Sequence, residues 1–465
     1  MSGAAAVVVV IVGVAFALAS GGHTTSGAAS GAPAPVGNGA VKPVANWQAL
    51  SAENNALATW TYGKSLIVAA NTQVTAYNQA TGAVLWQTRA PVDQKYHTMF
   101  CGASTTASGA TAVLGLGVVT DSTGADSDCH SIVSLNLATG KLGWAQALPS
   151  NAEQLTYARS LAGHPGRAQH GLVVEVSGHT AVAAWLGVMA GFSLTTGARE
   201  WTNVLGGESE FEGQVVKDIA ISGASTYAVD SVAYPPSMQL LQIDGATGKE
   251  TSKVTISTGM TGLTSPLEAT ILSTAPLAVS VQQILPSDNT SVVFFTKSLT
   301  AGWVLHSKPQ RSGDPEYYTA TPLNNVDAHQ FLPFALGNGM FVALTVPPSD
   351  SRKSTLVAFD AATGTKKWTA TVPGAEFIYP VAVTGSVVQA VGISQAGSGN
   401  PLLVSIDAAT GRVLSTGQPR VLGPAPLGQA NAFYRYVPAG GHVYGVNLTQ
   451  TTAAKGYVPA VFSLG

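Results

Sequence analysis

Short runs in which apolar residues recur at every second position fill most of the chain after residue 46, and turn residues separate them. Val74 with Ala76, and Val133 with Leu135, are two such alternating pairs, and SLIVAA (65–70) is a short apolar run of the same kind. A period of two predicts β-strands, and glycine with Asn or Asp between the runs predicts hairpins. The pattern therefore predicts an all-β protein of many short strands.

One hairpin motif recurs along the chain, with a Thr-Gly pair after a strand and, in most copies, a tryptophan four residues after the glycine. An Asn, Ser or Asp stands four residues before each glycine, where its side chain can cap the turn while glycine takes the positive-φ position. The six clean copies have Gly82, Gly140, Gly197, Gly248, Gly364 and Gly411. The capping residues are Asn78, Asn136, Ser193, Asp244, Asp360 and Asp407.

The spacing of this motif sets the size of the repeat. A degenerate copy, TKSLTAGWVLH, places Gly302 in the wide gap between the fourth and fifth clean copies, so successive glycines are 58, 57, 51, 54, 62 and 47 residues apart. About 52 residues with further strand-like runs between hairpins predict four strands per repeat. Four-stranded sheets that repeat radially form a β-propeller.

The two ends of the chain predict an eighth blade. The C-terminal AVFSLG matches the strand before a hairpin, Gly465 lies 54 residues after Gly411, and Asn46-Trp47-Gln48 resembles the strand after a hairpin. Pairing of these ends closes the ring and leaves no open edge there. Tryptophans at the repeated position are expected to pack between blades; these are Trp47, Trp86, Trp144, Trp201 and Trp368.

The first 45 residues differ from the rest. Ala4 to Ala19 are sixteen apolar or small residues, about 24 Å as a helix, which is shorter than the roughly 30 Å hydrocarbon core. Residues 1–20 are therefore expected to be a signal peptide or a membrane anchor, and both alternatives stay open. Residues 21–45, rich in Gly, Ala, Ser and Pro, predict a flexible linker before the propeller at 46–465.

Composition narrows the function classes. Only 10% of the residues are charged and the net charge is −2, so a basic surface for nucleic acid is not expected. Two cysteines exclude a four-cysteine zinc site, and the nine histidines show no HExxH pattern. Asp121, Asp126 and Asp128 lack the spacing and closing Glu of a calcium loop, which favours a solvated turn. We therefore expect no catalytic residue and no metal.

The [AT]-T-G-x-x-x-W repeat resembles the PQQ-like (quinoprotein-type) β-propeller repeat over residues 46–465. Members of that family include quinoprotein alcohol dehydrogenases and the outer-membrane assembly lipoprotein BamB. Ser252, His306 and Ser415 depart from the motif at the tryptophan position. The resemblance implies the propeller fold strongly and a function hardly at all.

The resemblance also implies a test for quinone chemistry. The dehydrogenases of the family carry an adjacent Cys-Cys pair and a calcium bound by Glu, Asn and Asp, and these features do not match this sequence. Its two cysteines, Cys101 and Cys129, are 28 residues apart. We therefore expect no quinone cofactor, and a PQQ- and calcium-dependent dehydrogenase stays the alternative.

Export into an oxidising compartment favours a disulfide between these two cysteines. Cys101 is expected on the first strand of the second blade and Cys129 just before the third. Strands two apart are about 9–10 Å apart, too far for a disulfide, and the loop 121–128 offers a way to bring Cys129 inward.

The links between blades all lie on one face and carry charged and aromatic residues that suit an interface. The alternative is that these residues only fill and solubilise the face. We expect an extracytoplasmic, monomeric, non-enzymatic binding or scaffold module for a protein, peptide or envelope component, or else the sensor domain of a membrane kinase-type receptor. The candidate binding residues are Tyr96, His97, Tyr157, Arg159, Glu208, Glu210, Phe211, Tyr317, Tyr318, Tyr434, Arg435 and Tyr436.

Overall fold

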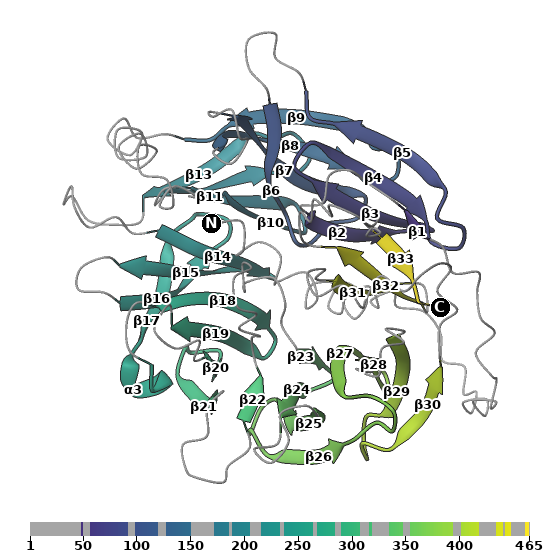
Figure 1. Ribbon diagram of the computed structural model, residues 1–465. Coiled ribbons are helices and arrows are strands. Elements are labelled where there is room, and N and C mark those ends of the chain that lie inside the picture. The colour runs from purple at the N-terminus through teal and green to yellow at the C-terminus, as the bar shows by residue number, and fades with distance from the viewer. Residues whose placement is uncertain are drawn as a thin grey trace, which may run out of the picture.

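The described residues form eight antiparallel sheets arranged as blades around a central axis (Figure 1). The only helix among them is the single turn α3 (Thr258–Thr261). The predicted eight-bladed propeller is therefore confirmed. The computed structural model describes residues 48–49, 56–91, 98–119, 127–149, 172–185, 188–204, 215–232, 237–263, 267–283, 290–306, 316–318, 334–346, 354–393, 401–417, 434–439, 442–447 and 461–464.

In blades 1 to 7 the strands follow chain order from the innermost to the outermost position. Blades 1 to 3 contain β2 (Ala56–Tyr62), β3 (Ser65–Ala70), β4 (Gln73–Asn78), β5 (Val84–Arg89); β6 (Thr98–Ala103), β7 (Thr111–Val119), β8 (Ser127–Asn136), β9 (Leu142–Ala147); β10 (Val173–Ser177), β11 (Thr180–Trp185), β12 (Val188–Ser193) and β13 (Arg199–Val204). Blades 4 and 5 contain β14 (Val215–Ser222), β15 (Ser225–Val232), β16 (Ser237–Asp244), β17 (Glu250–Ile256); β18 (Leu267–Thr274), β19 (Leu277–Gln283), β20 (Thr290–Phe295) and β21 (Ala301–His306). Blades 6 and 7 contain β22 (Glu316–Tyr318), β23 (Phe334–Gly337), β24 (Met340–Val346), β25 (Thr355–Asp360), β26 (Lys366–Ala370); β27 (Phe377–Thr384), β28 (Val387–Ile393), β29 (Pro401–Asp407) and β30 (Val413–Gly417).

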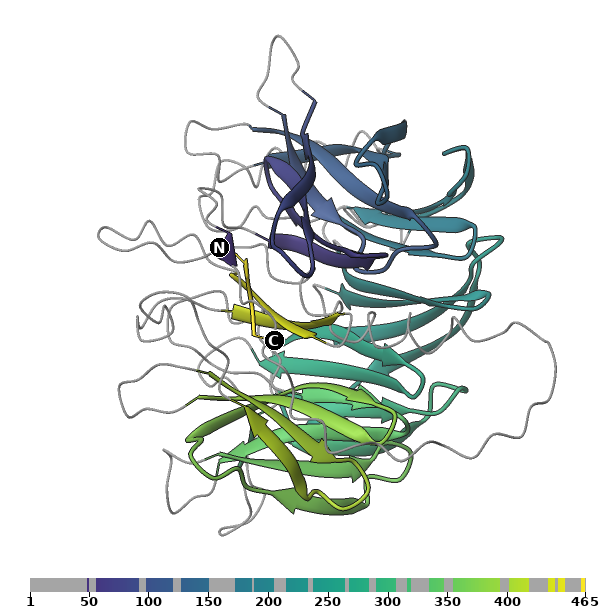
Figure 2. The same ribbon diagram turned by 90° about the vertical axis from the view of Figure 1, so that its right-hand side faces the viewer.

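Both ends of the chain build blade 8, as predicted. β31 (Tyr434–Ala439), β32 (His442–Asn447) and β33 (Val461–Ser463) come from the C-terminal part, and β1 (Gln48–Ala49) supplies the outermost strand. Gln48 pairs with Phe462 in the antiparallel ladder. Figure 2 shows the yellow strands of this blade between the purple strands of blade 1 and the green strands of blade 7. The pairing closes the ring without any covalent link.

The innermost strand of blade 6 has two parts. Tyr318 of β22 pairs with Leu344, and Phe334 of β23 pairs with the next residue, Ala343. β22 and β23 therefore lie end to end along β24, although they are separate in the sequence. The repeat analysis did not predict this division, because β22 is too short to show an alternating pattern.

The hairpin motif has the predicted geometry. Gly82 has a φ of 70°, and its N–H donates to the Asn78 carbonyl at 2.8 Å. The side chain of Asn78 accepts the N–H of Ala80 at 2.9 Å. The other five glycines of the clean copies also have positive φ. In each of these turns the last residue of the preceding strand is thus the capping residue, as its residue type predicted.

Tryptophans of one blade pack against the hairpin glycine of the next. A Cβ on Gly411 would lie 2.8 Å from Cδ2 of Trp368, so only glycine permits this approach. The indole N–H of Trp368 donates to the carbonyl of Ala408 at 2.8 Å. Trp144 and Trp201 make the same bond to the following blade, which confirms the predicted packing. Trp47 lies outside the described residues.

The prediction for the degenerate copy was wrong. Trp303, and not His306, occupies the tryptophan position: it packs on Gly364 and donates to the Ala361 carbonyl at 3.0 Å. Leu299, with a φ of 57°, takes the place expected for a glycine. Gly302 is part of strand β21. Among the described residues five tryptophans therefore occupy this position: Trp86, Trp144, Trp201, Trp303 and Trp368.

Candidate functional site

The two faces of the propeller differ in how the chain crosses them. Each outermost strand ends on the face where the next innermost strand begins, so all links between blades start from that face, here called the link face. The link from β9 to β10 spans 25 residues (148–172), and the link from β30 to β31 spans 16 (418–433). On the opposite face β2 and β3 are joined by only two residues, Gly63 and Lys64. Variable length is thus concentrated on the link face, which the sequence predicted as the binding face.

The candidate binding residues divide into three groups. Tyr317 and Tyr318 lie in β22, and Tyr434 and Arg435 begin β31, so these four belong to innermost strands and not to loops. The prediction for Tyr436 was wrong, because it is buried between blades 7 and 8 with Val381 and Phe462. The others lie outside the described residues: Tyr96, His97, Tyr157, Arg159, Glu208, Glu210 and Phe211.

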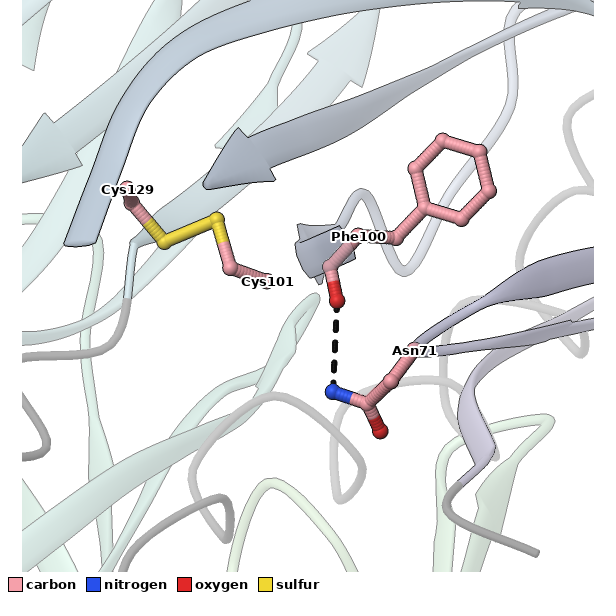
Figure 3. The surroundings of a disulfide bond; sticks show 4 residues. All are labelled: Asn71, Phe100, Cys101 and Cys129. Atoms are coloured by element: carbon pink, nitrogen blue, oxygen red, sulfur yellow. Dashed lines mark hydrogen bonds between the residues drawn. A yellow bond between two sulfur atoms is a disulfide. The ribbon is translucent and has the colours of Figure 1, made fainter. Parts of the chain in front are cut away.

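Cys101 and Cys129 form the predicted disulfide, with their Cα atoms 6.0 Å apart (Figure 3). Cys129 lies inside β8 and not before it, so two β-bulges shorten the distance where the sequence suggested a loop. Cys101 is the extra residue in β6 and His130 the extra residue in β8. The intervening strand β7 has Gly115 beside the disulfide, where a Cβ would lie 3.2 Å from Cys101 Sγ. The glycine leaves room for the cross-link.

The chain next to the disulfide is tied to blade 1. The Asn71 side-chain amide donates to the carbonyl of Phe100 at 3.2 Å, as Figure 3 shows. The N–H of Phe100 donates to the Asn71 carbonyl at 2.5 Å. One residue at the end of β3 therefore holds both backbone groups of Phe100, directly before Cys101. The disulfide and this pair together fix the innermost strand of blade 2.

Two buried carboxyl groups on innermost strands join neighbouring blades. Glu175 of β10 accepts the N–H groups of Thr105 at 3.0 Å and Thr106 at 3.2 Å, and both hydroxyls of these threonines also contact it. Burial raises the pKa of Glu175 above its ordinary value. The carboxyl group connects blade 3 to the residues that follow β6 in blade 2.

Asp218 of β14 has the corresponding role between blades 4 and 5. It accepts the N–H of Ile271 in blade 5 at 2.7 Å and that of Ile219 at 2.9 Å. Burial raises the pKa of Asp218 well above its usual range, and the nearby Glu175 carboxylate raises it further. Because both acids are nearly without solvent contact and hold backbone N–H groups, they are structural ties.

Asp230 of β15 is buried without such bonds. Its exposed fraction is 0%, and within the described part of the chain neither carboxyl oxygen has a hydrogen-bond partner. Burial raises its pKa to about 7, although the ammonium of Lys217 lowers it. The three acids were not predicted. The available signal was an acidic residue within an otherwise apolar strand, as in VVEVS and STYAVDSV.

Ser291 and His306 lie close together but do not form a nucleophile and base. The Ser291 hydroxyl donates to the Thr261 carbonyl at 2.8 Å and lies 3.1 Å from Nδ1 of His306. Ser291 is 1% exposed, so substrate cannot reach it. The contact fastens α3 to blade 5. Among the described residues no three His, Cys, Asp or Glu side chains are grouped to hold a metal ion, and Asp121 and Asp126 lie outside those residues.

A protein-family model described as outer membrane protein assembly factor BamB matches residues 44–254 and 326–452. No curated protein matches the sequence. Among solved structures, BamB from Moraxella catarrhalis is 12% identical with a TM-score of 0.44, over 91% of this chain and 98% of that one. A quinohemoprotein alcohol dehydrogenase from Pseudomonas putida HK5 is 10% identical with a TM-score of 0.49, over 90% and 75%. At these values the structural likenesses carry no argument about activity.

Proposed function

Because the chain belongs to the family of the outer membrane protein assembly factor BamB, we propose that it is a non-enzymatic propeller that binds a protein or peptide partner in the cell envelope. The contrast between the two faces carries this proposal. Tight, regular turns cover one face, whereas the long and unequal links start from the other. A rigid closed ring that presents variable loops on one side is suited to recognition.

The use of the polar residues supports a binding role over catalysis. Both cysteines of the chain are joined in a disulfide between strands of one blade, 28 residues apart. Glu175 and Asp218, two buried acids near the axis, accept backbone N–H groups from neighbouring blades. These groups maintain the ring and leave recognition to the links.

We further propose that residues 1–20 direct or anchor the protein in the envelope and that residues 21–45 form a linker to the propeller at 46–465. The uncharged apolar stretch before a Gly- and Ala-rich segment supports this arrangement. No helix among the described residues is long and apolar enough to cross a membrane. The described strands begin at Gln48, so the proposed linker leads directly into blade 8.

Photo-crosslinking in the native envelope tests the binding role. A benzophenone amino acid is placed in the full chain at Tyr96 or Phe211 in the links, and at Ala138 or Ala362 as controls. The two alanines are exposed at hairpin tips of the opposite face. We expect a discrete cross-linked protein from the link positions and none from the controls.

Equal cross-linking from all four positions, or none from any, would contradict the proposal.

A calorimetric titration with PQQ and calcium tests the dehydrogenase alternative directly. Binding tighter than about micromolar, which corresponds to roughly 8 kcal/mol, would replace recognition by quinone-dependent oxidation.

A further inference from the structure

The outer hairpins allow one structural position to be compared around the ring. The second and third residues after the hairpin glycine begin each outermost strand, near the face of tight turns. In blades 3 and 6 these residues are charged, and in blade 4 the first of them is; they are Arg199 with Glu200, Lys366 with Lys367, and Glu250 with Thr251. In blades 1, 2 and 7 they are Val84 with Leu85, Leu142 with Gly143, and Val413 with Leu414.

The aliphatic side chains at this position in blades 1 and 7 are exposed to solvent. Val84 is 52% exposed, Leu85 48% and Leu414 44%. They are three of the four large aliphatic side chains that are exposed in the described part of the chain. The fourth, Val204, ends β13 at the link-face end of blade 3. In blade 5 the corresponding residues, Ala301 and Gly302, are small and uncharged. Outer strands normally carry charge to protect their open edges, and at this position blades 7 and 1 carry exposed aliphatic side chains instead.

Blades 7 and 1 flank the closing blade, and blade 2 follows blade 1. Blade 8 packs against blade 7 through Tyr436 and Val381, and against blade 1 through Tyr444 and Leu66. We call the starts of the outer strands of blades 7, 1 and 2 (Val413, Leu414, Val84, Leu85 and Leu142) the apolar arc. Leu414, Val84 and Leu85 are its exposed members, whereas Val413 and Leu142 are half-buried against the cores of their blades. The chain that precedes the propeller joins it at β1, within this arc.

The charges beside the apolar arc are mostly basic. Lys141 and Arg412 are exposed at the hairpins of blades 2 and 7, whereas Arg89 ends β5 at the link-face end, as Val204 does in blade 3. The described acid there is Asp407, whose carboxylate accepts the N–H of Thr410 at 2.8 Å within its own turn. Arg412 also interacts electrostatically with the Asp407 carboxylate. Exposed aliphatic side chains next to Lys141 and Arg412 match the interface of a bilayer with anionic lipids.

From this juxtaposition we infer that the apolar arc is the surface with which the propeller contacts an anionic lipid bilayer. The inference rests on the envelope location proposed above. A linker of 25 residues (21–45) has a root-mean-square length of about 25–30 Å, which keeps the arc at high effective concentration near a membrane that holds residues 1–20. At such an effective concentration, a contact made by a few side chains is sufficient to hold the propeller against the bilayer.

Site-directed fluorescence on the full chain tests the inference. The native cysteines are joined to each other, so a single added cysteine can be labelled with an environment-sensitive dye. The variants are Leu85→Cys and Leu414→Cys in the arc, with Lys367→Cys as the matched control at the same structural position in blade 6. Vesicles contain phosphatidylcholine with or without phosphatidylglycerol and nitroxide-labelled lipid.

We expect the labels at positions 85 and 414 to be quenched at least about twofold more than the label at 367, with phosphatidylglycerol increasing the difference. Equal quenching at all three positions would overturn the inference while leaving the anchor and the link-face partner untouched. Failure of the full chain to float with vesicles would also overturn it. Loss of link-face cross-links with the quenching retained would instead reject the proposed function alone.

Discussion

The hydroxyl of Tyr444 donates a hydrogen bond to the carbonyl of Gln79, 2.9 Å away and 365 residues earlier in the chain. Gln79 stands three residues before Gly82, the place at which Ala361 and Ala408 accept the indole N–H of the preceding blade. A tyrosine of β32 thus binds the hairpin of blade 1 where other junctions use a tryptophan. The bond joins the first and last blades of the ring.

Tyr444→Phe removes this bond and leaves the carbonyl of Gln79 without it. We expect the free energy of unfolding to fall by about 1 kcal/mol, measured by urea denaturation. Tyr227→Phe is the control, because Tyr227 is also buried and no hydrogen bond of its hydroxyl exists among the described residues. An equal effect of both substitutions would show that the bond at the closure is energetically unimportant.

Gly411→Ala tests the tryptophan contact between blades 6 and 7. Gly411 has a φ of 74°, and the added Cβ would lie 2.8 Å from Cδ2 of Trp368. Gly385→Ala is matched in backbone conformation, with a φ of 56° and no atom within 4 Å of the new Cβ. We expect Gly385→Ala to cost about 1 kcal/mol and Gly411→Ala clearly more, by calorimetry. Similar losses would mean that the indole moves aside without cost.

Removal of the disulfide tests how far blade 2 depends on its cross-link. The Cys101–Cys129 bond closes a loop with a sequence separation of 28. In the chain-entropy model Cys101→Ala combined with Cys129→Ala lowers the free energy of unfolding by about 3–4 kcal/mol. Denaturation of the oxidised protein, the reduced protein and the double variant measures it. Reduction is expected to change the wild type and leave the double variant unaffected.

Asp230 predicts a pH dependence of stability. Its folded pKa of about 7 lies above the ordinary 3.8, so folding favours the protonated form. The contribution of Asp230 to the free energy of unfolding is therefore fully present below about pH 4. It is lost as the pH rises toward 7 and above, and the loss from this group amounts to up to about 4 kcal/mol. Lys217 is the charged group that opposes the shift.

Asp230→Asn removes the ionisation, so the variant is expected to be more stable than the wild type at pH 8 and similar to it at pH 4. Melting temperatures across this range measure the difference. A wild type and a variant with parallel pH profiles would contradict the assignment, because the carboxyl group would then have the same pKa in the folded and the unfolded state.

The tryptophan position shows where sequence reasoning succeeded and where it failed. Trp86, Trp144 and Trp201 follow a Thr-Gly pair at fixed spacing, so their packing was predictable from the repeat alone. In blade 5 the sequence placed His306 at this position instead of Trp303, because Leu299 adopts the positive φ that Gly302 was expected to take. Leu299 is buried in the cluster between blades 4 and 5, and that tertiary packing holds it in a conformation that its own sequence disfavours.

The number of blades, the hairpin chemistry and the pairing of the two chain ends were determined by the sequence itself, because each depends on patterns within a few residues or on their regular repetition. Only the tertiary structure decided which side chains meet across blades. The bulges that bring Cys101 to Cys129, the ties made by Glu175 and Asp218, and the burial of Tyr436 all depend on how neighbouring sheets pack. The apolar arc likewise appears only when the ring places blades 7, 8, 1 and 2 side by side, since periodicity fixes what each blade is but not which surfaces adjoin.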